Sequence, residues 1–210
     1  MTQRITQENS RLDHREWQKL KKLNTPKKVQ DYLNQLKFNF EKHGETNHSV
    51  KMVLKKGQAH CFEGALLAGA AFWVQGRRPL LLDLKAIRPD FDHVVTLFQE
   101  DGYWGAVSKT NHAVLRYREP IYKSVRELAM SYFHEYFLPN GVKTLRSFSK
   151  PFDLSKHGQD WLNSEKNLIA LTEKLDHSPH IEILTPKQRR NLRKAEEIEI
   201  KAGKIVQYKS

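Results

Sequence analysis

Apolar and polar positions recur with a helical period in the first part of the chain. In residues 25–36, "TPKKVQDYLNQL", apolar side chains return every three or four positions, Thr25 suits the N-cap, and Pro26 suits the first helical position. We expect an amphipathic helix there. Residues 1–24 carry few apolar side chains, and they predict an N-terminal arm or a peripheral helix.

A run of small apolar residues follows at 59–73, "AHCFEGALLAGAAFW". Its length and apolar character predict a buried helix that begins near Cys61. We expect this helix to end near Gly76, because glycine can adopt the left-handed conformation that ends many helices. We expect residues 47–60 to form the connection that leads into it.

After Gly76 the period changes to that of strands. Residues 77–86 form a short apolar run that is typical of a buried strand. Residues 92–110 form two β-rich runs that meet at Asp101-Gly102, a strong hairpin sequence. This order predicts an α+β fold in which the Cys-bearing helix packs on an antiparallel sheet and further helices flank it.

The second half of the chain predicts more helices. They lie at 124–137, 164–175 and 185–203, and the irregular residues 143–161 hold one short strand at most. We place the main domain at 25–184. Residues 185–210 then carry a basic C-terminal helix that packs on the same domain.

The composition restricts where the chain works and what it binds. With a single cysteine in 210 residues, no internal disulfide can form, and the sequence shows neither a signal peptide nor a membrane span. We expect a cytoplasmic protein with no membrane association. The net charge is +12, and its densest run, "PKQRRNLRK", lies at 186–194. Because no helix-turn-helix, RNA-binding-strand or zinc-finger pattern accompanies this charge, nucleic acid is not the partner that we favour.

Cys61 allows two interpretations. A lone cysteine in an apolar helix is most often a buried filler. It precedes the apolar run, however, and so belongs to the first helical turn, where unpaired N–H groups and the helix dipole stabilise a thiolate. Lys55, Lys56 and His60 add positive charge just before it. These features favour a nucleophile.

A cysteine nucleophile needs a base, and His93 is the best of the ten histidines. It opens a strand whose alternate residues are apolar, so its ring should lie at the rim of a core sheet. If the Asp-Gly pair is the turn, strand parity places Ser108 and Thr110 on the face of His93. Asn111 then points away unless the strand bends or ends there.

Three sequence blocks together resemble the core of the transglutaminase-like superfamily, the papain-related cysteine enzymes. They are "CFEGALLAGA", "DHVVTLF" and "GYWGAVS", and the resemblance covers about residues 55–112. By position it implies that Cys61 is the nucleophile and His93 the general base. The family usually has Asp where this chain has Ser108, which can orient His93 but cannot stabilise its charge as a carboxylate does. Asn111 is the alternative orienting residue, because related cysteine enzymes use Asn in that role.

The resemblance implies a thiol hydrolase or acyltransferase that acts on a peptide, an amide or a small acyl substrate, with no metal and no cofactor. The Cys61 backbone N–H would hold the oxyanion, with the side chain of Gln58 as a second donor. The alternative is a scaffold with little or no catalysis that binds an acidic partner or nucleic acid. Separately, we expect the buried-looking Asp83 to pair with a basic group such as Arg77 or Arg116.

Overall fold

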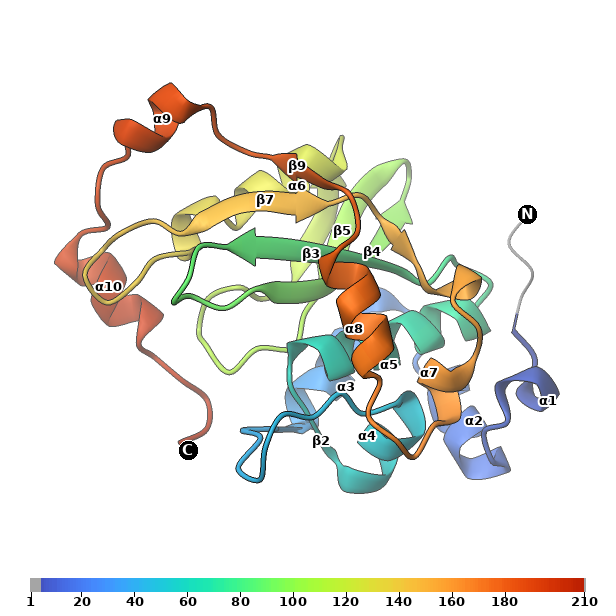
Figure 1. The fold of residues 1–210 in the computed structure, drawn as a ribbon. Coiled ribbons are helices and arrows are strands. Elements are labelled where there is room, and N and C mark those ends of the chain that lie inside the picture. Colours follow the sequence, from blue (N-terminus) through green and yellow to red (C-terminus); the bar gives the residue numbers. More distant parts are fainter. Residues whose placement is uncertain (1–4, 210) are drawn as a thin grey trace.

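The computed structural model describes residues 5–209 and has an α+β fold with one large antiparallel sheet (Figure 1). Its strands follow the order β6-β5-β4-β3-β7-β9, and β8 pairs with β3. The strands are β3 (Leu80–Ala86), β4 (His93–Glu100), β5 (Tyr103–Val107), β6 (Arg118–Tyr122), β7 (Leu145–Ser149), β8 (Phe152–Asp153) and β9 (His180–Glu182). A separate parallel pair joins β1 (Lys37–Phe38) to β2 (Gln58–Ala59).

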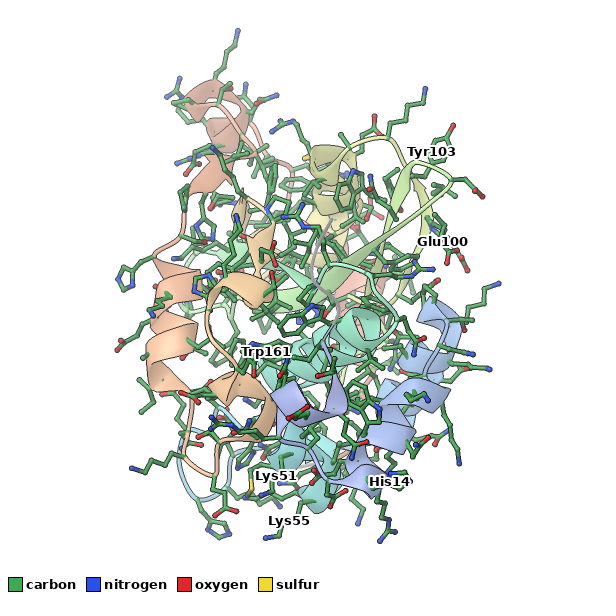
Figure 2. All side chains as sticks on the ribbon, turned by 90° about the vertical axis from the view of Figure 1, so that its right-hand side faces the viewer. His14, Lys51, Lys55, Glu100, Tyr103 and Trp161 are labelled. Atoms are coloured by element: carbon green, nitrogen blue, oxygen red, sulfur yellow. The ribbon has the colours of Figure 1, made fainter. Side chains whose placement is uncertain are left out.

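The hairpin of β4 and β5 confirms the predicted turn. Glu100 pairs with Tyr103, and the turn residues Asp101 and Gly102 have φ values of 50° and 82°. Two positive φ values are typical of the type I′ turn, whose twist matches that of the strands. Figure 2 labels Glu100 and Tyr103 at this end of the hairpin, at the edge of the molecule. The turn thus fixes which residues after β5 lie beside the start of β4.

Helix α5 (Cys61–Val74) lies in the interior between the sheet and a second layer of helices (Figure 1). All of its residues except the first are buried, which explains why its sequence is apolar on every side. It packs on β3 and β4, and the Thr96 hydroxyl donates a hydrogen bond of 2.8 Å to the Ala65 carbonyl. The helix ends as predicted, with Gln75 as its C-cap and Gly76 at a φ of 82°.

Short helices surround this arrangement. Those that contact α5 are α2 (His14–Lys22), α3 (Pro26–Gln35), α4 (Val50–Lys56) and α7 (Asp160–Asn163). The others are α1 (Gln7–Ser10), α6 (Val125–Ser131), α8 (Ile169–Asp176), α9 (Pro186–Arg190) and α10 (Glu197–Gly203), with 3-10 turns at Phe133–Glu135 and Leu154–Lys156. Within residues 5–209, no helix combines the length and the apolar character that crossing a membrane requires.

Two of the N-terminal expectations are met. Helix α3 forms where residues 25–36 predict it, and the Lys28 N–H donates to the Thr25 hydroxyl at 3.2 Å. Before it, α2 packs on α5 and buries Leu20. The N-terminal segment is therefore a peripheral helix that shares the main core, rather than an arm.

Other helical segments differ from their predictions. Residues 47–60 contain α4 instead of a connection, because Ser49 caps it and Val50 and Val53 bury one side of it. Residues 185–203 form α9 and α10 instead of one helix. The chain leaves the helical path between them, where the Ala195 N–H donates to the Gly141 carbonyl at 2.8 Å.

The remaining differences concern lengths and added strands. The helix predicted at 124–137 stops at Ser131 and continues as a 3-10 turn, and the helix predicted at 164–175 starts at Ile169. Within 143–161 the structure has two short strands, β7 and β8, where one at most was expected, and β6 and β9 also extend the sheet beyond the predicted strands. Strands β6 and β9 are short, and local sequence does not indicate that they pair with β5 and β7.

Candidate active site

The structure brings Cys61, His93 and Ser108 together at the start of α5. Cys61 is the first residue of that helix, His93 is the first residue of β4, and Ser108 directly follows β5. His93 interacts with Cys61 closely enough to lower the pKa of its thiol, and His93 Nε2 lies 2.7 Å from Ser108 Oγ. The three residues that the sequence singled out are therefore in contact, with His93 in the middle.

The hydrogen bonds of Ser108 fix the orientation of the imidazole. Its hydroxyl has one hydrogen, which it donates to the Leu115 carbonyl at 2.6 Å. The same oxygen therefore accepts from the Nε2–H of His93. Because Nε2 is engaged by Ser108, Nδ1 is the ring nitrogen that faces Cys61.

Ser108 is itself held by a side chain from α3. The Ser108 N–H donates to Gln30 Oε1 at 2.9 Å, and Gln30 Nε2 donates to the Ser108 carbonyl at 2.9 Å. Ser108 and Gln30 are both buried. This pair of hydrogen bonds ties the segment after β5 to the helical layer, so that the Ser108 hydroxyl has a defined position beside His93.

His60 is a second imidazole at the cysteine, and the sequence indicated only its charge. It is the N-cap of α5 and forms a hydrogen bond with the Cys61 thiol. Burial raises the pKa of this thiol, but the hydrogen bonds from His60 and His93 and the charges of both rings outweigh burial. They lower the pKa of Cys61 to about 5, so the group is a thiolate at neutral pH.

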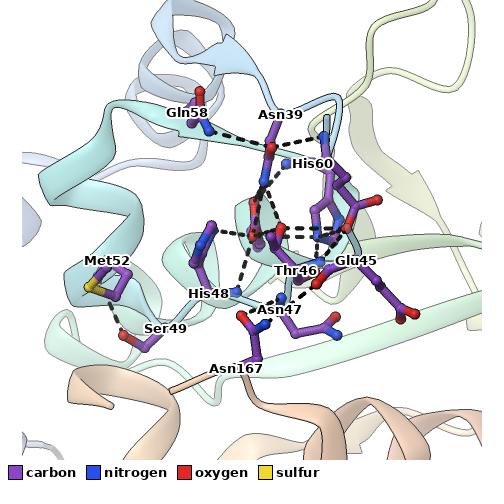
Figure 3. Close-up of polar contacts among 12 residues, drawn as sticks. Asn39, Glu45, Thr46, Asn47, His48, Ser49, Met52, Gln58, His60 and Asn167 are labelled. Carbon is purple, nitrogen blue, oxygen red and sulfur yellow. Dashed lines mark hydrogen bonds and ion pairs between the residues drawn. The ribbon is translucent and has the colours of Figure 1, made fainter. Parts of the chain in front are cut away.

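A fully buried carboxylate, Glu63, holds His60 in place. Figure 3 labels His60 together with Asn39, Thr46 and His48, whose polar groups lie around this carboxylate. Glu63 Oε2 accepts from the His60 backbone N–H at 3.1 Å, and Glu63 Oε1 lies 3.5 Å from His60 Nε2. Three further donors reach the carboxylate at 3.0 Å each: Asn39 Nδ2, Thr46 Oγ1 and the His48 backbone N–H. His60 Nε2 also lies 2.8 Å from the Thr46 carbonyl. Both oxygens of Glu63 are thus surrounded by donors, which favours the ionised form.

The charges at this helix start alternate. Burial lowers the pKa of His60, but the hydrogen bond and charge of Cys61 and the charge of Glu63 raise it to about 9. For Glu63 burial raises the pKa, and the charge of His60 and the hydrogen bond from Asn39 outweigh it, so the net pKa is lowered. The positive charge of His60 thus lies between the negative charges of Cys61 and Glu63, and each charge stabilises its neighbour.

Cys61, His60 and His93 line a pocket of about 640 Å³. Its other walls come from segments far apart in the sequence, within 38–41, 89–92, 109–115, 135–139 and 200–204. Many of these side chains are apolar or aromatic. A pocket of this size and character is typical of sites that enclose a small molecule.

Gln58 and Asn111 take no part in the contacts of His93. Gln58 Nε2 donates to Asn39 Oδ1 at 3.4 Å, and Gln58 is not among the described residues that line the pocket. Asn111 lines the pocket, but its Nδ2 donates to the Tyr208 carbonyl at 2.9 Å and its Oδ1 accepts from the Tyr208 N–H at 2.8 Å. Asn111 therefore points toward the C-terminal segment, as its strand parity predicts, and Ser108 is the residue beside His93.

Asp83 has a different partner from those predicted. It is buried, and its Oδ2 lies 3.2 Å from His180 Nε2 instead of pairing with Arg77 or Arg116. The hydrogen bond from Asp83 raises the pKa of His180 against the effect of burial. Asp83 does pair with a basic side chain, as predicted, but the partner is His180 and not one of the two arginines. Strand β9, to which His180 belongs, was not predicted from the sequence.

Among residues 5–209, one group of carboxylates could hold a metal ion. Asp83, Asp92 and Asp176 bring carboxylate oxygens within 4.8 Å of one another. Lys85 Nζ lies 2.6 Å from Asp176 Oδ1, and His180 lies against Asp83 as described. A basic group therefore already lies against two of the three carboxylates.

Sequence reasoning missed three residues that support the site. Glu63 follows the N-cap by three positions, the spacing of a capping box, so its contact with the His60 N–H could have been found. Gln30 and Asn39 lie in distant segments, and no local pattern connects them with Cys61. The sequence matches no protein-family model, and no curated protein matches it. The interpretation of the site therefore depends on its geometry.

Proposed function

We propose that this chain is a cysteine enzyme with a transglutaminase-like fold that forms an acyl thioester at Cys61. The observation that supports the proposal most directly is the contact of a low-pKa thiol with a histidine whose Nε2 is held by Ser108. The order of elements agrees with the resemblance in the sequence: the cysteine begins a helix, the histidine begins a strand, and the third residue follows the neighbouring strand.

The proposed reaction begins with the Cys61 thiolate. Its sulfur forms a bond to the carbonyl carbon of an amide or ester, and the carbonyl oxygen becomes an oxyanion. The Cys61 N–H, which has no acceptor within the helix at this first position, is placed to donate to that oxyanion. The C–N or C–O bond then breaks, and the leaving group takes from His93 the proton that His93 received from the Cys61 thiol when the thiolate formed.

The second half of the reaction releases the acyl group. His93 accepts a proton from a water or an amine, whose oxygen or nitrogen attacks the thioester carbonyl carbon. The C–S bond breaks and the thiolate of Cys61 is restored. Attack by water gives hydrolysis and attack by an amine gives acyl transfer. Cys61 and His93 have the same roles in both reactions.

The alternative is a binding module for an acidic partner or nucleic acid, which has weaker support. Two arginines of the basic run at 186–194 are engaged in ion pairs, Arg189 with Glu182 and Arg193 with Glu196. Pairing of this kind reduces the charge that remains for phosphates. The pocket and the lowered pKa of Cys61 have no role in that alternative.

Formation of the thioester can be tested with 4-nitrophenyl acetate. We expect a burst of 4-nitrophenolate and an acetyl adduct on the Cys61 peptide in mass spectrometry, because acylation of a thiolate by this ester precedes release. Cys61→Ser should abolish both. With 4-nitroacetanilide, whose leaving amine must take a proton from His93, His93→Gln should slow acylation by roughly 100-fold. If the adduct is absent, or if His93→Gln forms it from the anilide as fast as the unchanged protein, the proposal is wrong.

A further inference from the structure

One wall of the Cys61 pocket is the C-terminal strap, defined here as residues 197–209. Its helix α10 contributes Ile200 and Gly203 to the pocket lining, and the C-cap residue Lys204 contributes as well. In Figure 1 α10 and the chain that follows it pass outside one end of the sheet and continue down toward the C-terminal label. The strap therefore covers a side of the pocket that the core elements leave open.

The strap is tied down at both ends by backbone hydrogen bonds. Just before it, the Ala195 N–H donates to the Gly141 carbonyl at 2.8 Å. At the other end, the Ala113 N–H donates to the Ile205 carbonyl at 2.9 Å, and the Gln207 N–H donates to the Asn111 carbonyl at 2.8 Å. The two hydrogen bonds between the Asn111 amide and Tyr208 complete this second anchor.

Between its anchors the strap makes few contacts: His112 Nδ1 lies 3.2 Å from the Gly203 carbonyl, Lys143 pairs with Glu199 at 3.8 Å, and Phe137 lies against Gly203. Helix α10 buries no residue, and the side chains of Ile198 and Ile205 are 70% and 61% exposed. Segments with few buried apolar contacts and exposed backbone hydrogen bonds open at low free-energy cost. Release of the anchor at Asn111 would therefore uncover the pocket without unfolding the core.

The pocket that the strap closes has an apolar lining opposite it. Phe38, Phe40 and Val114 contribute to the walls, and Phe137 packs against the strap, where a Cβ added at Gly203 would lie 3.0 Å from its ring. With the strap in place the volume is about 640 Å³, enough for a small ligand. An extended polypeptide needs a groove that is open at both ends, whereas a pocket of this volume, with the strap as one of its walls, matches a small ligand.

We infer that the C-terminal strap is a gate over the Cys61 pocket, and that the closed pocket takes a small acyl donor with an apolar acyl group rather than a polypeptide. The inference names the substrate class for the proposed function and depends on it for the acyl chemistry. The gate itself depends only on the pocket walls and on the anchors of the strap.

Alkylation with reagents of two sizes tests the gate. Cys61 is the only cysteine, so any label reports on this site alone. The reagents are iodoacetamide and a fluorescein-linked iodoacetamide, at neutral pH. Gln207→Pro removes the N–H that anchors the strap to Asn111, together with the exposed side-chain hydrogen bonds to the Asn34 carbonyl and the Tyr208 hydroxyl. Gln207→Ala removes only those side-chain hydrogen bonds and keeps the N–H, so it serves as the matched control.

In the unchanged protein we expect iodoacetamide to react fast and the large reagent slowly. Gln207→Pro should speed the large reagent by roughly tenfold and change iodoacetamide by less than about twofold, as expected for the loss of one hydrogen bond at an exposed anchor. Gln207→Ala should change neither. Circular dichroism melting of both variants checks that the core stays folded.

Acyl donors extend the test to the substrate class. We expect 4-nitrophenyl butyrate to acylate all three proteins alike, and the 4-nitrophenyl ester of a blocked tetrapeptide to acylate Gln207→Pro faster than the other two. Equal rates for the large and small alkylating reagents in the unchanged protein, or no gain in Gln207→Pro, would overturn the gate. Failure of iodoacetamide itself to react with Cys61 would contradict the proposed function and this inference together.

Discussion

At the scale of single residues, the site combines a strongly stabilised thiolate with a base that is oriented by a neutral group. Ser108 fixes the ring of His93 but supplies no charge to it, whereas a carboxylate would. The charged support lies on the other side of the sulfur, in His60 and Glu63. Ionisation of Cys61 and orientation of its base are therefore carried by different residues.

Replacing Ser108 with Ala should separate these two properties. The variant removes the acceptor of the His93 Nε2–H, so acylation by 4-nitroacetanilide, whose leaving amine needs a proton from His93, should slow by roughly tenfold. The pH at which iodoacetamide alkylation reaches half of its maximal rate should remain about 5, because His60 still interacts with the thiol. Stopped-flow acylation and a pH profile of alkylation measure the two effects.

Ser149→Ala is the matched control for this experiment. Ser149 is also buried, and its hydroxyl accepts from the Asp83 N–H, away from Cys61. It should leave both rates unchanged. A Ser108→Ala variant that is acylated at the rate of the unchanged protein would show that Ser108 does not position His93.

At the scale of elements, the active site depends on how closely α5 approaches the segment after β5. A Cβ built on Gly64 would lie 2.4 Å from Lys109 Cβ. Lys109 cannot retreat easily, because its buried ammonium donates to the carbonyls of Leu33 and Leu36 at the end of α3. Burial and the nearby charge of Arg116 lower the pKa of Lys109 to about 8. Gly64 thus allows the contact that holds Ser108, the neighbour of Lys109, against the helix layer.

Two glycine substitutions in α5 should therefore have different effects on stability. Alanine in place of glycine in a helix adds about 1 kcal/mol of helix propensity. At Gly69 the nearest atom to a new Cβ is the end of the Leu154 side chain at 3.1 Å, which can move. We expect Gly69→Ala to be neutral to stabilising, and Gly64→Ala to lower the free energy of unfolding by about 1–3 kcal/mol through overpacking.

Urea denaturation of the two variants measures this difference, and Gly69→Ala is the control for helix propensity. Gly64→Ala should also slow acylation of Cys61, because a shift of Lys109 moves Ser108. Equal stability of the two variants would mean that α5 and the segment after β5 can separate without cost.

At the scale of the whole molecule, features that depend on residues close together in the sequence could be predicted, and contacts between distant segments could not. The buried helix, the hairpin and the meeting of His93 with Ser108 follow from local periodicity and a turn of known register. The hydrogen bonds of Gln30 with Ser108 and of Asn111 with Tyr208 join segments far apart in the chain. No periodicity specifies such partners, so the support of Ser108 and the strap became visible only in the folded chain.

The charges at the start of α5 also couple the site to the stability of the whole fold. The pKa of Cys61 is about 5 in the folded chain and that of His60 about 9. In the unfolded chain an imidazole has a pKa of roughly 6.5 and a thiol one of roughly 8.5. Between a pH of about 5 and one of about 6.5 the unfolded chain therefore binds one proton more than the folded chain.

Stability should consequently rise with pH across that interval, by roughly 2 kcal/mol from this pair of residues. Above a pH of about 6.5, His60 of the unfolded chain has lost its proton and Cys61 has kept its own. In the folded chain Cys61 has lost its proton and His60 has kept its own. The two states then bind equal numbers of protons at these residues, so their contribution stays level up to a pH of about 8.5. Urea denaturation at several pH values between about 5 and 8.5 measures the dependence.

Cys61→Ser isolates this contribution, because it removes the thiolate while the charge of Glu63 and the hydrogen bond to the Thr46 carbonyl continue to raise the pKa of His60. The variant should lack the rise between a pH of about 5 and one of about 6.5, so its deficit in unfolding free energy relative to the unchanged protein should grow by roughly 2 kcal/mol over that interval. The lowered pKa of Glu63 acts below this range, since its stabilisation is lost only as the carboxylate protonates at acidic pH. A deficit that stays constant with pH would mean that Cys61 is not ionised in the folded chain near a pH of about 6.5, and the nucleophile would lose its electrostatic basis.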